Sequence, residues 1–236
     1  MTGRVIGVLG GMGPAATADF YTKLVMLSAA GTDQAQPRVV IWADPTVPDR
    51  SRALTGDGPD PTPWLLNGVR TLERAGATVL AIPCNTAHAF LPRITGQVNI
   101  PVVHMIDEVA KFLAATRPDV RTAGVLATAG TVSAGLYQQA LSAVDIRAVV
   151  PPGPVQRLRV DRAVRAVKAG DRGDQVRRDL LLAATGLVGQ GAEVLIAGCT
   201  EIPLGLPPAD MPWPLIDPAL VLAQAVLAHI VEPVTA

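Results

Sequence analysis

Aromatic, charged and sulfur-containing side chains are scarce in this chain. Phe, Trp and Tyr make up 3% of its 236 residues, charged residues make up 17%, and there are three histidines and two cysteines. Basic and acidic residues number twenty each, so the formal net charge is zero, and no basic stripe with interleaved aromatic residues is present. Because nucleic-acid recognition depends on such basic surfaces, these absences argue against a nucleic-acid partner.

Long apolar runs are absent as well. Hydrophobic residues make up 49% of the chain, but no apolar run reaches the roughly eighteen residues of a membrane-spanning helix. The first residues, MTGRVIGVLGG, lack a full apolar core followed by a small-residue cleavage site. We therefore expect a globular protein of the cytoplasm, with a large buried core and no membrane partner.

The two cysteines, Cys84 and Cys199, are poor candidates for a disulfide or a metal site. A reducing compartment disfavours a disulfide. His88 follows Cys84 by four residues, and a single Cys-x3-His pair without further ligands is a weak zinc signal. We expect no bound metal. Two interpretations stay open: buried structural thiols, which are common, or reactive thiols at a functional site.

An internal duplication gives these cysteines equivalent positions. Residues 76–84 read GATVLAIPC and residues 191–199 read GAEVLIAGC, and each cysteine ends an apolar, strand-like run. A second block agrees, because RVIGVLGGMGPAATADFYTKL, from Arg4, reappears as RTAGVLATAGTVSAGLYQQAL, from Arg121. The two blocks are displaced by almost the same number of residues. Their agreement indicates two repeats with one thiol in each.

The alternation of short apolar runs with longer amphipathic stretches predicts an α/β fold. Continuous apolar strands indicate parallel sheets covered on both faces, so we expect two similar doubly wound domains related by the duplication. The strands are expected at 4–9, 37–42, 77–82, 101–103, 121–127, 146–150 and 193–197, and the helices at 14–29, 62–75, 86–94, 105–116, 132–142, 155–169, 175–189 and 217–231.

The domains are expected to meet at a hinge within residues 98–120, where the first repeat ends. The first domain would comprise residues 1–103 and the last helix, at about 217–236, which has no counterpart in the first repeat and is expected to cross back. The second domain would comprise residues 104–216. Residues 43–63 are rich in Pro, Asp and Gly and predict a long binding loop.

Ligands of parallel α/β sheets bind beyond the carboxyl ends of the strands. The first strand is followed by GGMGP at residues 10–14, a turn that directs backbone N–H groups toward a possible anion. This turn also satisfies a loose dinucleotide fingerprint, with Asp44 after the next strand as a ribose-binding acid. The equivalent loop at residues 127–131 keeps one glycine and adds two hydroxyl groups, which favours a small anion over a pyrophosphate.

Each cysteine is followed by polar residues that suit a helix N-terminus. Asn85 and Thr86 follow the first thiol, and Thr200 and Glu201 follow the second. A sulfur at such a position is favoured as the thiolate. Two opposed thiols can invert an α-carbon without a cofactor, because one removes a proton from one face and the other supplies a proton to the opposite face. Converging hydroxyl and N–H groups would stabilise the carbanion.

Six motifs occur in order across the whole chain: GVLGGMGP, PDR, PCNTAH, LATAGT, VKAG and GCTEIPL. They resemble the aspartate racemase branch of the aspartate/glutamate racemase superfamily. The glutamate racemase branch opens with a DSG-type loop and carries histidine after the second Cys-Thr, where this chain has GGM and Glu201. The resemblance implies a cofactor-independent, homodimeric racemase of acidic amino acids, with its active site in the cleft between two similar α/β domains.

The resemblance also implies roles for individual residues. Cys84 and Cys199 match the acid/base pair, and Arg50 and Lys168 match positions that bind the distal carboxylate. Glu201 could orient Cys199 or help to deprotonate it, although a salt bridge or a favourable charge at a helix N-terminus would also explain it. The residues expected to bind substrate are Met12, Arg50, Asn85, Thr86, Thr128, Thr131, Lys168 and Thr200.

Asp44 and Ala129 depart from this pattern, because an amide and a hydroxyl are frequent at those positions. Asp44 near the cleft could repel an acidic substrate or hold its ammonium group. His88 is expected on a helix surface, satisfied by solvent. We predict interconversion of L- and D-aspartate, with glutamate as a further substrate. The alternatives are a related two-cysteine racemase or isomerase for another small acid, a nonenzymatic ligand-binding protein with the same cleft, and a nucleotide-dependent oxidoreductase.

Overall fold

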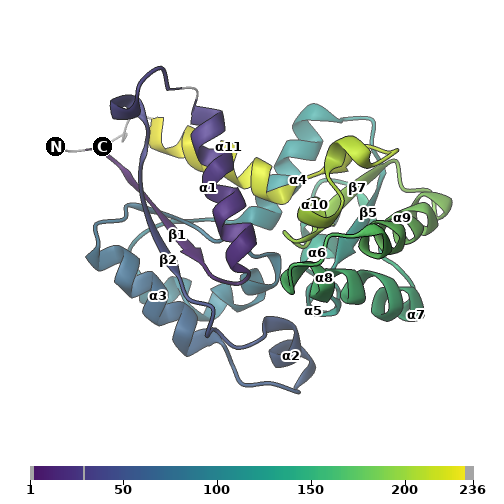
Figure 1. The fold of residues 1–236 in the computed structure, drawn as a ribbon. Coiled ribbons are helices and arrows are strands. Elements are labelled where there is room, and N and C mark those ends of the chain that lie inside the picture. The colour runs from purple at the N-terminus through teal and green to yellow at the C-terminus, as the bar shows by residue number, and fades with distance from the viewer. Residues whose placement is uncertain (1–2, 29, 232–236) are drawn as a thin grey trace.

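The computed structural model describes residues 3–28 and 30–231. Within them the chain forms two four-stranded parallel sheets of the same strand order, β2-β1-β3-β4 and β6-β5-β7-β8. We call the part built on the β2-β1-β3-β4 sheet the first half and the part built on the β6-β5-β7-β8 sheet the second half. Figure 1 shows the two halves beside each other. The predicted α/β fold with two parallel sheets is confirmed. The strands are β1 (Val5–Gly10), β2 (Arg38–Ala43), β3 (Val79–Ala81), β4 (Val102–Val103), β5 (Thr122–Ala127), β6 (Arg147–Val149), β7 (Val194–Gly198) and β8 (Leu215–Ile216).

Helices connect the strands, as parallel pairing requires. No helix within the described ranges combines the length and hydropathy of a membrane span. The first half contains α1 (Pro14–Ser28), η1 (Asp33–Ala35), α2 (Arg50–Thr55), α3 (Thr62–Arg74), η2 (Asn85–Arg93) and η3 (Thr95–Gln97). The linking helix α4 (Met105–Thr116) is followed by α5 (Ala129–Ser133), α6 (Leu136–Ser142), α7 (Gly153–Val155), η4 (Gln156–Val160), α8 (Asp161–Lys168), α9 (Asp174–Gly189), α10 (Ile202–Gly205), η5 (Pro208–Asp210) and α11 (Pro218–Val231).

The central strands β1 and β5 are buried along their whole length. In the first half, Leu65 and Leu72 of α3 pack in the core on one face of the sheet. Phe20 and Leu24 of α1 pack in a separate core with other side chains of β1. Covering on both faces explains why these strands read as continuous apolar runs.

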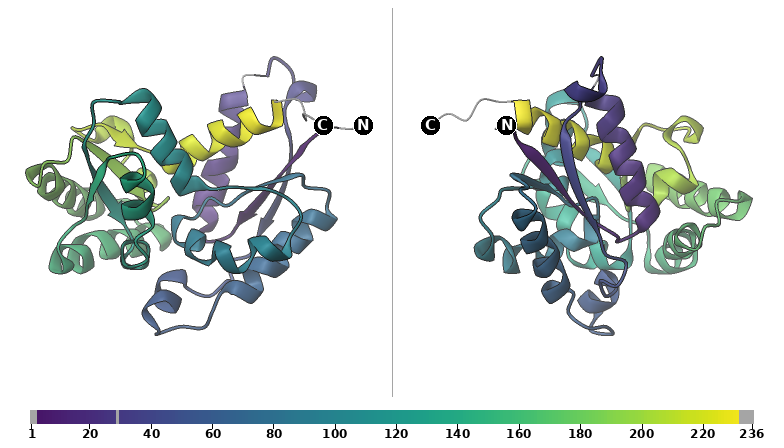
Figure 2. Two further views of the ribbon diagram at one scale, coloured as in Figure 1. Left: turned by 180° about the vertical axis from the view of Figure 1, so that it is seen from behind. Right: turned by 60° about the vertical axis from the view of Figure 1, so that its left-hand side comes forward.

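The last helix, α11, returns to the first sheet. Leu222, Ala223 and Val226 share a hydrophobic core with Ile6 and Val8 of β1. Helices α1 and α4 both pack against α11, and the view from behind in Figure 2 shows it ending beside α1. The limits of the two domains stay a prediction, and this packing attaches the last helix to the first sheet.

The duplication is visible in the packing of one glycine in each half. A Cβ atom at Gly7 would lie 2.7 Å from the Cβ of Ala77, and one at Gly124 would lie 3.0 Å from the Cβ of Ala192. The same added Cβ atoms would lie 3.0 Å from Leu80 Cδ2 and 2.8 Å from Leu195 Cδ2, respectively. These residues correspond in the sequence repeat. The same close packing against the neighbouring strand and the segment before it therefore excludes a side chain at the same position of both halves.

The segment expected to be one long loop, residues 43–63, contains the helix α2. The Asp49 carboxylate accepts a hydrogen bond from the Arg52 N–H at 2.9 Å and caps the first turn. Gly56 ends the helix in the left-handed conformation, with φ of 82°. Composition indicated a loop, but these local caps stabilise a short helix within it.

Three expected helices have a different form. The helix expected at 132–142 begins earlier and is divided into α5 and α6 at Gly135, whose φ is 67°. The segment expected at 86–94 is the 3-10 helix η2, which contains Pro92, a residue without a backbone donor. The helix expected at 155–169 contains the π-helical turn η4, a feature that is common beside functional sites. The two-residue strand β8 was not expected, because it is too short to show a periodicity.

Replacing Gly124 with Ala should lower the free energy of unfolding by about 1 to 3 kcal/mol, because the added methyl group would overpack a filled contact. A matched control is Gly186→Ala in α9, where a Cβ atom would meet nothing within 4 Å. That exposed helical position should gain about 0.5 to 1 kcal/mol. Urea denaturation followed by circular dichroism measures both changes. Equal effects of the two substitutions would contradict this packing argument.

Candidate active site

A cavity of about 300 Å³ lies between the two halves. Its walls come from the segments that follow β1, β3, β5 and β7, together with α2 and α8. The carboxyl ends of both sheets therefore face one space, as expected for parallel sheets. Every candidate site residue from the sequence lines this cavity except Thr131.

Cys84 and Cys199 occupy equivalent places in the cavity wall. Cys84 precedes η2, and Cys199 directly follows β7. Both are free thiols, each with 6% of its surface exposed. No group of three or more His, Cys, Asp and Glu residues suited to a metal occurs in the part of the chain that the structure describes. The two thiols thus reach the same cavity from opposite halves.

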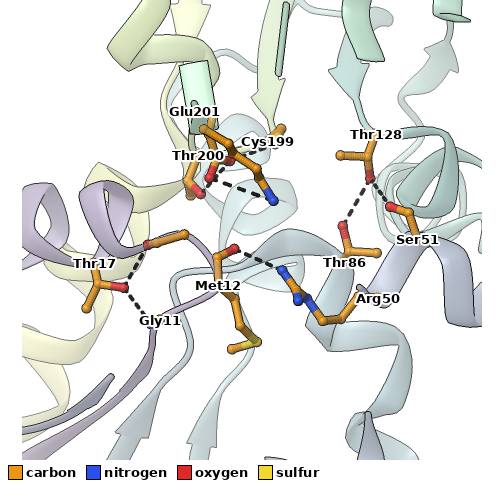
Figure 3. A network of polar contacts seen from close by, with 12 residues as sticks. Gly11, Met12, Thr17, Arg50, Ser51, Thr86, Thr128, Cys199, Thr200 and Glu201 are labelled. Atoms are coloured by element: carbon orange, nitrogen blue, oxygen red, sulfur yellow. Dashed lines mark hydrogen bonds and ion pairs between the residues drawn. The ribbon is translucent and has the colours of Figure 1, made fainter. Parts of the chain in front are cut away.

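Glu201 contacts the second thiol directly. The Cys199 thiol donates a hydrogen bond of 2.9 Å to Glu201 Oε2, and the Thr200 hydroxyl donates to the same oxygen at 3.4 Å (Figure 3). Burial raises the pKa of Cys199 well above its usual range, and the Glu201 carboxylate raises it further. Cys199 is therefore the protonated thiol in this arrangement.

Lys168 brings a positive charge to the same corner of the cavity. Its Nζ atom lies 4.0 Å from Glu201 Oε1. Burial alone would lower the pKa of Lys168, but the Glu201 carboxylate raises it above its usual value. The lysine therefore stays charged at neutral pH beside both thiols.

Hydroxyl groups from both halves form one network at the other side of the cavity. The Thr86 hydroxyl lies 3.0 Å from that of Thr128 and 2.8 Å from that of Thr131. The Ser51 hydroxyl, on α2, donates to Thr128 at 3.1 Å (Figure 3). Thr131 is buried behind the others and supports the network without lining the cavity.

Arg50 is buried, with 8% of its surface exposed, and three backbone carbonyls hold its guanidinium. Nη1 donates to Val47 and Pro48 at 3.0 and 2.8 Å, and Nη2 donates to Met12 at 3.2 Å. Met12 thus contributes its backbone oxygen to this arrangement (Figure 3). Within the described residues, Arg50 Nε is buried and has no hydrogen-bond partner. A fixed cation with a free donor therefore lies in the cavity wall.

Asn85 also presents a free donor. Its Oδ1 atom accepts a hydrogen bond of 2.6 Å from the hydroxyl of Tyr137, a residue of α6 in the second half. The Asn85 Nδ2 atom is buried and finds no partner among the described residues. Tyr137 was not a candidate from the sequence, because no local motif marks a tyrosine on a distant helix.

Two equivalent glycines mark where the halves touch beside the cavity. A Cβ atom at Gly13, in the first half, would lie 2.6 Å from Glu201 Oε1 of the second half. A Cβ atom at Gly130, in the second half, would lie 2.6 Å from the Cα of Ser51 in the first half. Each loop therefore approaches the opposite half at the glycine that the repeat shares.

His88 is a correction to the sequence prediction of a solvated surface histidine. It is 1% exposed; its Nδ1–H donates to the Cys84 carbonyl at 2.9 Å, and its Nε2 accepts from the Met105 N–H at 3.1 Å. Burial, with a smaller contribution from His104, lowers the pKa of His88 to about 3. Neutral His88 therefore connects the Cys84 backbone to the start of α4. The sequence prediction was wrong because the packing that buries His88 comes from distant parts of the chain and cannot be inferred from the η2 segment alone.

The Thr17 side chain packs against the glycine turn that follows β1. The Gly11 N–H donates to the Thr17 hydroxyl at 2.9 Å (Figure 3). A Cβ atom at Gly10 would lie 2.3 Å from the Thr17 side chain. Asp44 does not line the cavity; its carboxylate accepts from the N–H and hydroxyl of Thr46. These contacts do not form the open pyrophosphate cradle with a ribose-binding acid that a dinucleotide site needs.

Sequence reasoning missed several residues at the cavity. Asp161 accepts hydrogen bonds from the Ala129 N–H at 3.1 Å and from Gln156 Nε2 at 3.0 Å. It begins α8, so Arg165 and Lys168 line the cavity from the same helix. The spacing of Asp161, Arg165 and Lys168, four and three residues apart, places them on one helix face and could have indicated it. The π-helical turn before α8 changes the helical period there, so the start of this face could not be predicted from the spacing. The other missed lining residues are Asp49, Ser51, Arg52, Thr55 and Val164.

The family model for Asp/Glu/hydantoin racemases matches residues 9–226. The chain therefore belongs to the Asp/Glu/hydantoin racemase family and is an isomerase of the amino-acid racemase type. It is 27% identical to the broad specificity amino-acid racemase RacX of Bacillus subtilis (strain 168), over 95% of this chain and 97% of that protein.

Solved and curated relatives extend this likeness. The Picrophilus torridus aspartate racemase structure superposes with a TM-score of 0.86 at 29% sequence identity, over 97% of this chain and 94% of that chain. A glutamate racemase of Corynebacterium glutamicum is 33% identical over 56% of this chain and 47% of that protein. The resemblance read from the six motifs is thus confirmed at the level of the family.

Replacing Glu201 with Gln should lower the pKa of Cys199, because the carboxylate is a negative charge that opposes the thiolate. In a Cys84→Ser background, the pH midpoint for alkylation of Cys199 by iodoacetamide should move to lower pH. Alkylation near pH 8 should become several times faster. The control is Glu108→Gln, which removes a carboxylate paired with Lys111 on the surface. An unchanged or higher midpoint in Glu201→Gln would contradict the direct electrostatic contact.

Proposed function

We propose that this protein interconverts L- and D-aspartate by two-cysteine acid/base proton transfer at the α-carbon, without a cofactor. The observation that carries the proposal is that Cys84 and Cys199 line one cavity from equivalent strand ends of two similar halves. Stereochemical inversion needs a proton acceptor on one face and a proton donor on the other, which this pair can supply.

One thiolate would remove the α-proton while the opposite thiol delivers a proton to the other face. A free cysteine has a pKa of about 8.5, so a thiolate is accessible near neutral pH. Because the Cys199 thiol donates to Glu201, Cys199 would act as the acid and Cys84 as the base in a turnover that starts from this arrangement. The roles reverse for the opposite enantiomer, because a turnover leaves Cys84 as the protonated thiol and Cys199 as the thiolate.

The α-carboxylate would be held by neutral donors. Asn85 Nδ2 is free of any partner in the described chain, and the hydroxyls of Thr86, Thr128 and Thr200 line the same cavity, with Thr131 behind Thr86 and Thr128. These donors would stabilise the charge that moves into the carboxylate when the α-proton leaves. Donors fixed before the reaction stabilise a developing anion most effectively, because they need not reorganise.

The distal carboxylate would be held by Arg50 and Lys168. Arg50 is fixed by backbone carbonyls and keeps a buried Nε donor without a partner in the described residues. Lys168 stays charged beside Glu201. A planar guanidinium and an ammonium group form a complementary pair for a carboxylate. Met12 would contribute indirectly, through the carbonyl that orients Arg50.

Glutamate or another small acid is the second candidate substrate class. The likeness to a broad specificity amino-acid racemase over nearly the whole chain favours it. Arg52 and Arg165 also line the cavity as exposed side chains from α2 and α8, where they could meet a longer acidic substrate. We extend the proposal to a homodimer, which rests on the family resemblance alone, and to the cytoplasm, which rests on the sequence pattern alone.

Cys84→Ser and Cys199→Ser should each reduce racemisation of aspartate in both directions to background, because a hydroxyl is too weak an acid and base to replace the thiol. Chiral chromatography of reactions started from each enantiomer measures the rates. Cys84 and Cys199 should matter equally, and a thermal melting curve for each variant checks that the fold is retained. Substantial two-way turnover by either variant would overturn the two-cysteine proposal.

Arg50→Ala should reduce kcat/KM for aspartate by about 10- to 100-fold, the effect of losing a hydrogen-bonded ion pair to substrate. Turnover of a neutral amino acid such as alanine should change far less. Arg70→Ala is the control, since Arg70 is exposed on α3 and does not line the cavity. Equal losses for aspartate and alanine would remove Arg50 from side-chain recognition.

A further inference from the structure

Tyr137 and Asn85 form a buried hydrogen bond between the two halves beside the cavity. Tyr137 belongs to α6 and is 1% exposed, whereas Asn85 directly follows Cys84 and is 2% exposed. The tyrosine hydroxyl donates to Asn85 Oδ1 at 2.6 Å. Tyr137 itself does not line the cavity, but Asn85 does. The tyrosine can therefore affect a bound molecule only through the asparagine.

An asparagine amide has one accepting edge and one donating edge, and rotation by half a turn exchanges them. With Oδ1 bonded to Tyr137, the Nδ2 group takes the other direction, where it is buried and has no partner in the described structure. An unpaired buried donor is costly, which indicates that a ligand acceptor completes it.

The tyrosine is well suited to hold this orientation. Burial raises the pKa of Tyr137 well above its usual value, and the charge of Asp217 raises it further, so the phenol keeps the proton that it donates. Its ring is also confined, because a Cβ atom at Gly198 of β7 would lie 3.0 Å from Tyr137 Cε2. The hydroxyl therefore has a fixed position relative to the strand that leads to Cys199.

We propose that Tyr137 is a positioning residue that holds the Asn85 amide with its NH2 group toward the cavity, so that the site offers a donor to the substrate α-carboxylate. This inference rests on the proposed function, in which Asn85 binds that carboxylate. Without the phenol hydroxyl, the amide can turn and direct Oδ1 at the carboxylate, which repels it. Because the two residues belong to different halves, carboxylate recognition on the first half depends on the second half being in place.

Tyr137→Phe removes only the hydroxyl and tests this directly. It should reduce kcat/KM for aspartate by about 5- to 30-fold, the range for losing one oriented hydrogen bond. Tyr21→Phe is the matched control, because Tyr21 is 44% exposed on α1 and should show no loss. In an Asn85→Ala background, Tyr137→Phe should cause no further loss of kcat/KM, since the amide that it orients is absent.

Asn85→Asp separates orientation from simple packing. One aspartate oxygen would still accept from Tyr137, and the other would face the substrate carboxylate as a negative charge. Asn85→Asp should therefore be less active than Asn85→Ala, although it keeps the hydrogen bond to Tyr137. Asn85→Asp that equals or exceeds Asn85→Ala in activity would overturn the proposal.

The double-mutant cycle also distinguishes the two levels of the argument. If the unmodified protein does not racemise any amino acid in a panel, the proposed function fails. If it does racemise but Tyr137→Phe loses the same factor with and without Asn85, Tyr137 has only a structural role and the inference is overturned. Free energies of unfolding for the same variants report the hydrogen bond independently of turnover, and a coupling of zero there would also overturn it.

Discussion

Two parallel sheets that direct their carboxyl ends at one space are the constraint on which this site depends. A thiol follows one inner strand of each sheet, Cys84 after β3 and Cys199 after β7. The segments after β1 and β5 complete the walls of the cavity. A single sheet can offer groups to only one side of a small substrate. Two related sheets can enclose both faces of a carbon atom, which is the geometrical requirement of inversion.

The two repeats differ in the side chains that follow the thiols. Thr86 and Glu201 hold equivalent places after the two thiols, yet one joins a hydroxyl network and the other holds the thiol proton. Gly13 and Gly130 have stayed glycine, since each lies against the opposite half. Similar backbones thus carry different side chains, so the two thiols have different surroundings before substrate arrives. That asymmetry favours the protonated thiol at Cys199.

The fold, and the cavity-lining residues that follow the strands, could be predicted from the sequence because their signals are local, whereas Arg50 and Lys168 were indicated only by the family resemblance. Apolar runs marked the strands, and the residues that follow each run lie at the sheet edge where ligands bind. His88 and Tyr137 could not be predicted, because their burial depends on helices far away in the sequence. The short helix α2 was missed for a different reason, since its caps outweighed a composition typical of loops. Unpartnered buried donors, such as Arg50 Nε, are revealed only by the folded chain, and in our proposal they select the substrate.

The central claim is that one thiol removes the α-proton while the other supplies a new one. The most direct test is to start with L-aspartate in deuterated water and measure α-deuterium in both enantiomers at early conversion. The two-cysteine account predicts that the D-aspartate formed carries deuterium almost completely, whereas the remaining L-aspartate carries almost none. Equal deuterium content in the two enantiomers from the earliest times would show a single acid/base group serving both faces and would contradict the account.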